Sequence, residues 1–277
     1  PVKSDPLAPI LKPAVQSSVS SLLADYRTKR RYRDDSFPMK TAAFDAFRED
    51  LRSSLASSLG LEEWRVARSE GKSNSLAGRF HDRLLQTTNW QDVRMEVRLI
   101  EIPETGDRVP AVICLPKGED RHPGVCVFSG HSRHGLKDLV VDLDSYQQGV
   151  AVRLAQAGFV AIAVEKIDTG YLSRGFTSGI DEQEIATHRL GWGRTTRAHQ
   201  LMACLAATEI LATHTRVDES RIGATGVSLG GWLSVQTALL TDRIHVIADF
   251  GRKTLQVPDD LQAKGFNGMK DLCHILP

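Results

Sequence analysis

The sequence has few features that would indicate a membrane, a metal or a polyanion as its partner. No stretch approaches the run of about 18 apolar residues that a membrane-spanning helix needs. Lysine and arginine total 35 against 34 acidic residues, so a net charge of +1 gives no electrostatic case for binding nucleic acid. The four cysteines have no short C-x-x-C spacing, which favours buried free thiols over a metal site or a disulfide framework.

A secretory signal is also missing from the start of the chain. The sequence begins with Pro1 and not with methionine, which indicates that something precedes it in the gene product, removed by processing or left out. Both a cytoplasmic location and export after processing are therefore left open.

Residues 1–90 are interpreted as a helical N-terminal arm. A first helix is expected over residues 15–27, and a second begins at Thr41 and ends at Gly60. The apolar side chains of the second helix recur at helical spacing and fall on one face: Phe44, Phe47, Leu51, Leu55 and Leu59. This face must pack on something, and the main domain, a pocket mouth and a homo-oligomer are the alternatives.

Residues 91–277 alternate between expected strands and helices, which predicts an α/β domain with a doubly wound, mostly parallel sheet. A hairpin turning at residues 104–107 leads the domain. Further buried strands are expected over 124–129, 159–164, 222–225 and 244–248. Between the first two of these strands, Asp144 is expected to cap a helix that ends at Gly158, with Gln147 as its capping-box partner.

The most informative motif is Gly226-Val227-Ser228-Leu229-Gly230-Gly231, which follows an expected strand and precedes an expected helix. A serine in a sharp strand-to-helix turn between glycines is typical of the nucleophile of an α/β-hydrolase. Glycines are needed because Cβ atoms would clash where the strand and the helix cross, and because the serine backbone is strained. The motif predicts Ser228 as a nucleophile, and a structural glycine turn is the alternative.

A serine nucleophile needs backbone donors for the oxyanion that forms during acyl transfer. The predicted first donor is the amide of Leu229, at the positively polarised start of the next helix. The predicted second donor is the amide of His131, in the glycine-rich loop 129–135 after the third strand of the domain. Gly130 and His134 of this loop are candidates for contact with the substrate.

The long glycine-rich segment 168–192 lies between a strand and a helix, where insertions commonly form a lid and a pocket wall. Tyr171 and Trp192 are candidates to line an acyl or alcohol pocket. Ordinary loop packing is an equal alternative for both.

Several ordered runs of sequence resemble one known group. They are HPGVCVFSGHSRHG, RLAQAGFVAIAV, LGWGRTT and RVDESRIGATGVSLGG. Over residues 93–277 the chain resembles the dienelactone-hydrolase and acetyl-xylan-esterase-like branch of the α/β-hydrolases. The resemblance implies the α/β-hydrolase fold and a serine hydrolase that acts on esters. Ser129-Gly130 stands where that group usually has His-Gly, and Glu165 stands where it has an acidic residue after the fourth strand. Asp218 and Arg221 match a structural turn.

The resemblance also implies a catalytic acid after the next strand and a histidine beyond it. Neither is found before Pro277, so the C-terminal strands of the fold are expected outside this sequence. A longer chain, a second chain or segment that completes the fold, and a loss of catalysis are the explanations, and the first two are favoured because an exposed sheet edge is an aggregation hazard. Asp249 is an alternative acid, with a loop cap as its competing interpretation. Four histidines outside the loop 129–135 are interpreted as structural: His188, His199, His245 and His274.

The sequence thus predicts a serine esterase in which Ser228 attacks the ester carbonyl and water releases the acyl group. The expected partner is a small-molecule ester, with no cofactor, metal or nucleic acid. A peptidase or acyltransferase on the same fold, and a non-catalytic protein that binds through the hydrolase pocket, are the alternatives.

Overall fold

The computed structural model describes residues 41–65, 68–69, 72–73, 76, 78–132, 134–167, 169–172, 182–191 and 193–250. The chain divides into two compact units, Pro1–Asp50 and Leu51–Pro277. The expected helix over 15–27 lies outside the described residues. The candidate site belongs wholly to the second unit.

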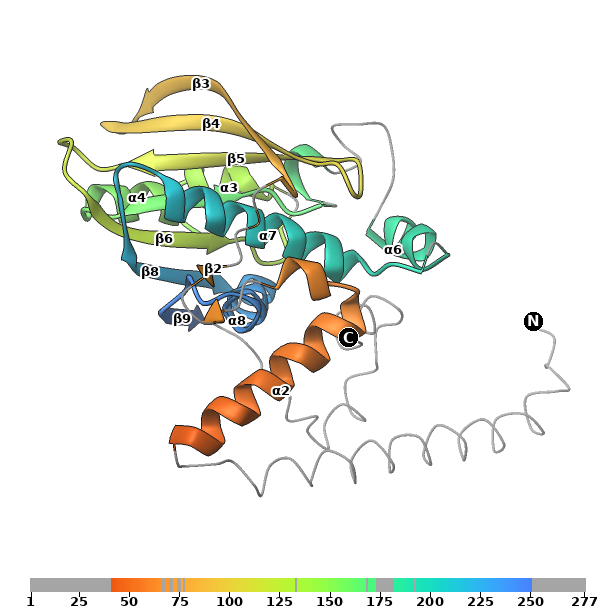
Figure 1. Ribbon diagram of the computed structural model, residues 1–277. Coiled ribbons are helices and arrows are strands. Elements are labelled where there is room, and N and C mark those ends of the chain that lie inside the picture. The colour runs from red at the N-terminus through yellow and green to blue at the C-terminus, as the bar shows by residue number, and fades with distance from the viewer. Residues whose placement is uncertain are drawn as a thin grey trace, which may run out of the picture. The chain divides into compact units, whose positions relative to one another are not determined.

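A seven-stranded sheet with the order β3-β4-β5-β7-β6-β8-β9 forms the centre of the second unit (Figure 1). Its strands are β3 (His81–Trp90), β4 (Val93–Ile102), β5 (Asp107–Leu115), β6 (His122–Phe128), β7 (Val160–Val164), β8 (Val217–Val227) and β9 (Val246–Phe250). β7, β6, β8 and β9 run parallel to one another, whereas β3, β4 and β5 join them through antiparallel pairings. A separate small ladder pairs β1 (Arg68–Ser69) with β2 (Lys72–Ser73).

Helices cover both faces of this sheet. The described helices are α2 (Thr41–Leu59), α3 (Leu136–Val140), α4 (Val150–Gln156), α6 (Glu182–Gly191), α7 (Thr196–Thr213) and α8 (Leu229–Leu240), with short 3-10 turns η1 (Glu62–Trp64) and η2 (Gly170–Leu172). Alternate residues of β6 point to opposite faces, so Cys126 and Phe128 pack in the core with α7 and α8, while Val127 packs in the core with α3 and α4. The sheet with helices on both faces confirms the predicted α/β class.

Helix α2 ends where the sequence predicts. Gly60 follows Leu59 with a φ of +65°, a conformation that glycine adopts without strain. Arg52, in the part of α2 that belongs to the second unit, is buried and joins the helix to the end of α8. Its Nε donates to the carbonyl of Leu239 and its guanidinium pairs with Asp242, both at 2.6 Å. Because the guanidinium is buried and paired, this contact holds residues 51–59 of α2 against the end of α8.

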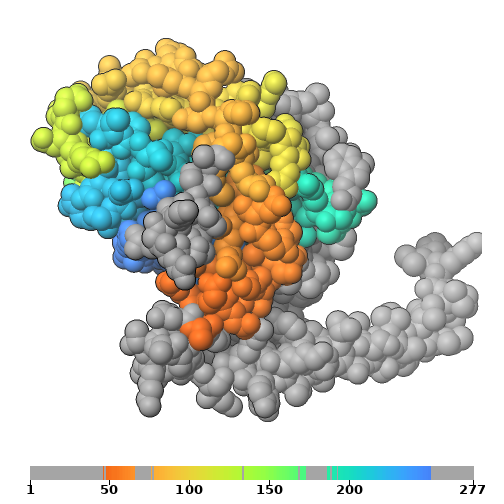
Figure 2. Space-filling model, viewed as in Figure 1, coloured from red at the N-terminus to blue at the C-terminus, as the bar shows by residue number. Residues whose placement is uncertain are grey.

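Residues 81–90, which the sequence interpretation placed in a helical arm, form the strand β3. The domain boundary at residue 90 stays a prediction, but this part of the arm is strand and not helix. β3 pairs with β4 through a tight turn in which Gln91 and Asp92 both have positive φ. Its side chains are mostly exposed along the upper rim of the visible face (Figure 2). An exposed edge strand lacks a clear alternation of apolar and polar residues, and the turn after β3 lacks glycine. The two usual sequence signals of a β-hairpin are therefore weak here.

The helix expected over residues 144–158 is shorter than predicted. α4 begins at Val150 after Gly149, which has a left-handed φ of 57° and no side-chain cap. Asp144 and Gln147 therefore do not form a capping box. Residues 145–149 instead form a turn tied back to α3, with Gly149 N donating to the carbonyl of Asp138 at 3.0 Å.

The three described cysteines, Cys114, Cys126 and Cys204, are buried and unbridged, as predicted. Burial raises the pKa of Cys114 to about 12, so its thiol stays protonated at ordinary pH. Cys273 lies outside the described residues. No helix among the described ranges has the length and apolar character needed to cross a membrane.

Candidate active site

The carboxyl ends of the parallel strands bring four chemically informative positions to one edge of the sheet. Ser129 follows β6, Glu165 follows β7, Ser228 follows β8, and Asp249 lies near the end of β9. In open α/β sheets this edge is where ligands bind. The edge is therefore the candidate site.

Ser228 occupies the sharp turn between β8 and α8. It is the N-cap of α8, with φ 56° and ψ −115°, a backbone conformation that residues with a Cβ rarely adopt. Its amide donates to the carbonyl of Phe250 at 2.9 Å, which ties the turn to β9. The half-buried serine hydroxyl makes no capping hydrogen bond. The turn therefore holds a strained serine whose side chain is not used to stabilise the helix.

The glycines around Ser228 are required by close approach of three backbone segments. A Cβ at Gly226 would collide with the backbone of Gly230, and a Cβ at Gly230 would collide with the carbonyl of Phe128. A Cβ at Gly231 would meet the carboxylate of Asp249. The glycine pattern is thus the steric consequence of packing β8, α8 and the end of β6 together.

The loop after β6 lies directly against this turn. β6 and β8 are parallel neighbours with Phe128 opposite Gly226, so their ends emerge side by side. A Cβ on Gly130 would lie 2.5 Å from the carbonyl oxygen of Val227, the residue before Ser228. The structure therefore brings the loop with Gly130 and His131 close to the turn with Ser228 and Leu229.

A model of the dienelactone hydrolase family matches residues 109–264. The chain belongs to the dienelactone hydrolase family. It is also 26% identical over 172 residues to the "Putative hydrolase YtaP" of Bacillus subtilis (strain 168), covering 57% of this chain and 56% of that one. The chain thus spans about half the length of this curated relative.

Solved structures support the same fold. A "putative acetyl xylan esterase" from Bacteroides fragilis NCTC 9343 aligns with a TM-score of 0.58 at 14% identity, over 74% of this chain and 52% of that chain. "Methylesterase BT1017" aligns with a TM-score of 0.55 at 21% identity, over 81% of this chain and 45% of that chain. At these identities the likeness concerns the fold. Membership of the family assigns the chain to the α/β-hydrolases.

Glu165 joins the loops that follow β6 and β7. Its buried carboxylate accepts hydrogen bonds from the amides of Leu136, Lys166 and Tyr171 and from the hydroxyl of Thr169, at 2.8–3.2 Å. A Cβ at Gly135 or at Gly170 would collide with it. Burial raises the pKa of Glu165 to about 7, although these hydrogen bonds act in the opposite direction. Glu165 is thus a buried acid that holds two site loops together.

Glu165 should make stability depend on pH. Because its pKa is raised from 4.5 to about 7 by folding, the folded state binds this proton more tightly than the unfolded chain does. Its contribution is therefore fully present below pH 4.5 and lost as pH rises through about 7. The stability advantage of the wild type over Glu165→Gln is expected to shrink by about 3 kcal/mol between roughly pH 4 and pH 8. Urea unfolding of both proteins across this range measures the difference, and a gap that stays constant with pH would contradict the expectation.

Asp249 is brought to the same edge as Ser228. It pairs with Gly226 across the β8–β9 ladder, and its carboxylate lies against Gly231 in the first turn of α8. A carboxylate at the start of a helix is favoured by the helix dipole. Its proposed role as an acid stays a prediction, but its placement beside the Ser228 turn agrees with that role.

No histidine of the described ranges is hydrogen-bonded to Ser228. His131 and His134 are exposed in the loop after β6, and His245 is exposed near β9. His199 is buried in the first turn of α7. Within the described residues, no group of three or more side chains suited to hold a metal ion is present either.

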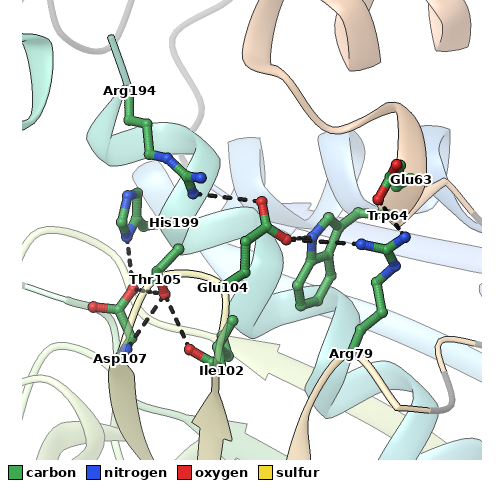
Figure 3. A network of polar contacts seen from close by, with 9 residues as sticks. All are labelled: Glu63, Trp64, Arg79, Ile102, Glu104, Thr105, Asp107, Arg194 and His199. Atoms are coloured by element: carbon green, nitrogen blue, oxygen red, sulfur yellow. Dashed lines mark hydrogen bonds and ion pairs between the residues drawn. The ribbon is translucent and has the colours of Figure 1, made fainter. Parts of the chain in front are cut away.

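His199 belongs to a polar network that the sequence did not reveal (Figure 3). Its Nδ1 lies 2.6 Å from a carboxylate oxygen of Asp107, at the start of β5, and Thr105 donates to the same oxygen at 2.7 Å. Burial disfavours ionisation of Asp107, but the hydrogen bonds from His199 and Thr105 outweigh it and lower the pKa of Asp107. The pairing ties His199 to the β4–β5 hairpin, which agrees with the structural interpretation of this residue. The partners are 92 residues apart, so no local pattern could indicate the contact.

At the tip of the β4–β5 hairpin, Glu104 contacts the segment η1 that precedes the sheet. Its carboxylate accepts from the indole Nε1 of Trp64 at 2.7 Å and pairs with Arg194 at 3.4 Å. Figure 3 shows Glu104 between these two side chains, with Arg79 on the side of Trp64. The β4–β5 hairpin, predicted from a turn signal alone, therefore also fastens η1 and the segment before α7.

The candidate pocket residues stay predictions. Tyr171 is in the short turn η2, where its side chain is 41% exposed and its amide bonds Glu165. Trp192 lies outside the described residues. Asp218 and Arg221 form the expected structural turn, with Arg221 Nε 2.6 Å from Asp218, at a bulge in β8.

Proposed function

We propose that this protein is a serine hydrolase that cleaves carboxylic esters through an acyl-enzyme intermediate. The observation that carries the proposal is the conformation of Ser228 at the N-terminus of α8. Its positive φ and the absence of a capping hydrogen bond correspond to a nucleophile elbow, in which strain presents the hydroxyl instead of burying it. Ester substrates are favoured because the family is named for a lactone, a cyclic ester, and both solved neighbours are named as esterases.

The proposed reaction begins with attack of Ser228 Oγ on the ester carbonyl. The carbon–oxygen π electrons move to the oxygen, and the amides of Leu229 and His131 stabilise the resulting oxyanion. The tetrahedral intermediate collapses and the bond from the carbonyl carbon to the alkoxide oxygen breaks. The alcohol leaves with the proton that Ser228 Oγ has lost, and the acyl group remains on Ser228. Water then attacks this acyl-enzyme and releases the carboxylic acid.

The start of α8 makes Leu229 a suitable donor. The first amides of a helix have no acceptor within the helix and lie at its positive end. Leu229 is the first residue of the twelve-residue helix α8 and is buried, so its amide acts where water is excluded. Asp249 is the alternative candidate for the catalytic acid, with a loop cap as its competing interpretation, and no histidine of the described ranges is assigned as the general base.

Labelling with a fluorophosphonate probe tests the proposal. Intact mass is expected to show one adduct per wild-type chain, and none on Ser228→Ala, because only an activated serine attacks the phosphorus at a useful rate. Ser58→Ala, which removes an exposed serine of α2, is the matched control and should label like the wild type. Equal labelling of the wild type and Ser228→Ala would reject Ser228 as the nucleophile.

A further inference from the structure

The loop that carries His131 is held by two neighbouring side chains from one turn. Gln147 is buried and its Oε1 accepts a hydrogen bond from the amide of Gly130 at 3.0 Å. Tyr146 is half-exposed and its hydroxyl donates to the carbonyl of His131 at 3.1 Å. Both contacts cross from the segment before α4 to the end of β6.

These two bonds act on the peptide groups on either side of a third. The amide of Gly130 belongs to the Ser129–Gly130 peptide, and the carbonyl of His131 belongs to the His131–Ser132 peptide. Between them lies the Gly130–His131 peptide, whose N–H is the second proposed oxyanion donor. Because peptide groups are planar, holding both neighbours restricts the rotations that aim this N–H.

The turn that carries the two side chains is itself rigidly attached. Ser145 Oγ donates to the carbonyls of Asp138 and Asp142 at 3.1 and 2.9 Å, and Gly149 N donates to the carbonyl of Asp138 at 3.0 Å. The positive φ of 57° at Gly149 then starts α4. Tyr146 and Gln147 therefore project from a support that is fixed to α3.

The space around Gly130 leaves no room for a side chain. A Cβ there would lie 2.5 Å from the Tyr146 hydroxyl and 2.5 Å from the carbonyl of Val227. The Tyr146 hydroxyl and the carbonyl of Val227, the residue before Ser228, thus both lie close to Gly130. Partial burial, followed by the charge of Asp138, raises the pKa of Tyr146 to about 12, so its hydroxyl remains a donor at ordinary pH.

The Gln147 side chain bonds Gly130 but is not fully satisfied, which lowers the stability of the protein. Its Nε2 is buried and has no hydrogen-bond partner among the described residues. A buried amide nitrogen without a hydrogen-bond partner lowers stability, so an apolar side chain of the same size would suit this buried position better. Among the described residues, the hydrogen bond from Gly130 is the one that the Gln147 side chain makes.

We propose that Gln147 and Tyr146 are positioning residues that aim the His131 amide at the reacting carbonyl oxygen. The inference rests on the proposed function, because it assigns these residues to the same oxyanion site. Neither residue touches the substrate in this scheme. Their effect is on the transition state, in which the oxyanion forms, and not on substrate binding.

Substitution with a matched rescue variant tests the inference, with p-nitrophenyl acetate as the probe. Gln147→Met keeps the size of the side chain but removes the acceptor, and is expected to lower kcat about tenfold or more with KM changed less than about twofold. Gln147→Glu keeps an acceptor oxygen in either protonation state and should restore kcat to within about threefold of the wild type. A purely structural role would not separate Met from Glu in this way, nor kcat from KM.

Tyr146→Phe provides the second variant, because it keeps the ring and removes only the hydroxyl. It is expected to lower kcat severalfold with an unchanged KM, and it keeps the test open if Gln147→Met does not fold. Gln156→Met is the control, since Gln156 is an exposed glutamine at the other end of α4 that donates to the carbonyl of Gln91. It should keep the wild-type kcat.

The outcomes separate this inference from the proposed function. A wild type that labels on Ser228 and turns over the ester, with folded Gln147→Met and Tyr146→Phe variants of full kcat, would overturn the positioning role alone. A wild type without Ser228-dependent labelling or turnover would overturn the proposed function and the inference with it. A rise in KM at constant kcat in the Gln147→Met and Tyr146→Phe variants would also contradict the positioning role.

Discussion

Ser228→Gly is expected to abolish ester hydrolysis and to make the protein more stable. Loss of the nucleophile should lower kcat/KM at least about a thousandfold. The same change removes a Cβ from a residue with φ 56° and ψ −115°, where glycine is unstrained. Relief of this strain, reduced by the added flexibility of the unfolded chain, should raise the free energy of unfolding by about 1 kcal/mol.

Ser228→Ala is the control that separates the two effects. Alanine removes the hydroxyl but retains the Cβ, so activity should be lost while the free energy of unfolding stays close to that of the wild type. Urea unfolding and ester kinetics on the three proteins measure both quantities. If Ser228→Gly were less stable than Ser228→Ala, the turn would not be strained, and the argument that strain presents the hydroxyl would fail.

Gly230→Ala is expected to have the largest effect on stability. Its added methyl group would collide with the carbonyl of Phe128 at the end of β6. The backbone of Gly230 and the backbone of Phe128 meet where α8 packs on the sheet. Neither segment can move aside without disturbing the ladder between β6 and β8. We expect a loss of at least about 3 kcal/mol in the free energy of unfolding, or failure to fold.

Gly191→Ala is the matched control for this substitution. Gly191 is the last residue of α6, it is exposed, and a Cβ there would meet nothing within 4 Å. The control should be neutral or slightly stabilising, because alanine is a better helix former. Thermal and urea unfolding compare the two variants. A Gly230→Ala protein as stable as the control would show that the α8–β6 approach is looser than the structure indicates.

Local patterns predicted much of the fold because the relevant forces are local. Strand β7 follows from a continuous apolar run, and the β4–β5 hairpin follows from a turn with Gly106, whose φ is +71°. The helix start at Val150 was missed because Asp144 and Gln147 have the spacing of a capping box. In the folded chain Gln147 bonds Gly130 instead. A side chain that can cap a helix can equally accept a bond from a distant loop, and tertiary contact decides between them.

What the sequence by itself determined is the family, the α/β class and the serine turn. The motif around Ser228 is sufficient to predict the turn because any helix that crosses a strand this closely leaves no room for Cβ atoms, so glycines are required there. The tertiary structure alone decided which side chains support that turn. Three sets of contacts join residues that are far apart in sequence. Gln147 and Tyr146 bond the loop after β6, Glu165 bonds two loops, and Asp107 bonds His199. Their contacts depend on strand order and register, which bring the start of β5 and the ends of β6, β7 and β8 to one edge, and no local pattern encodes that order.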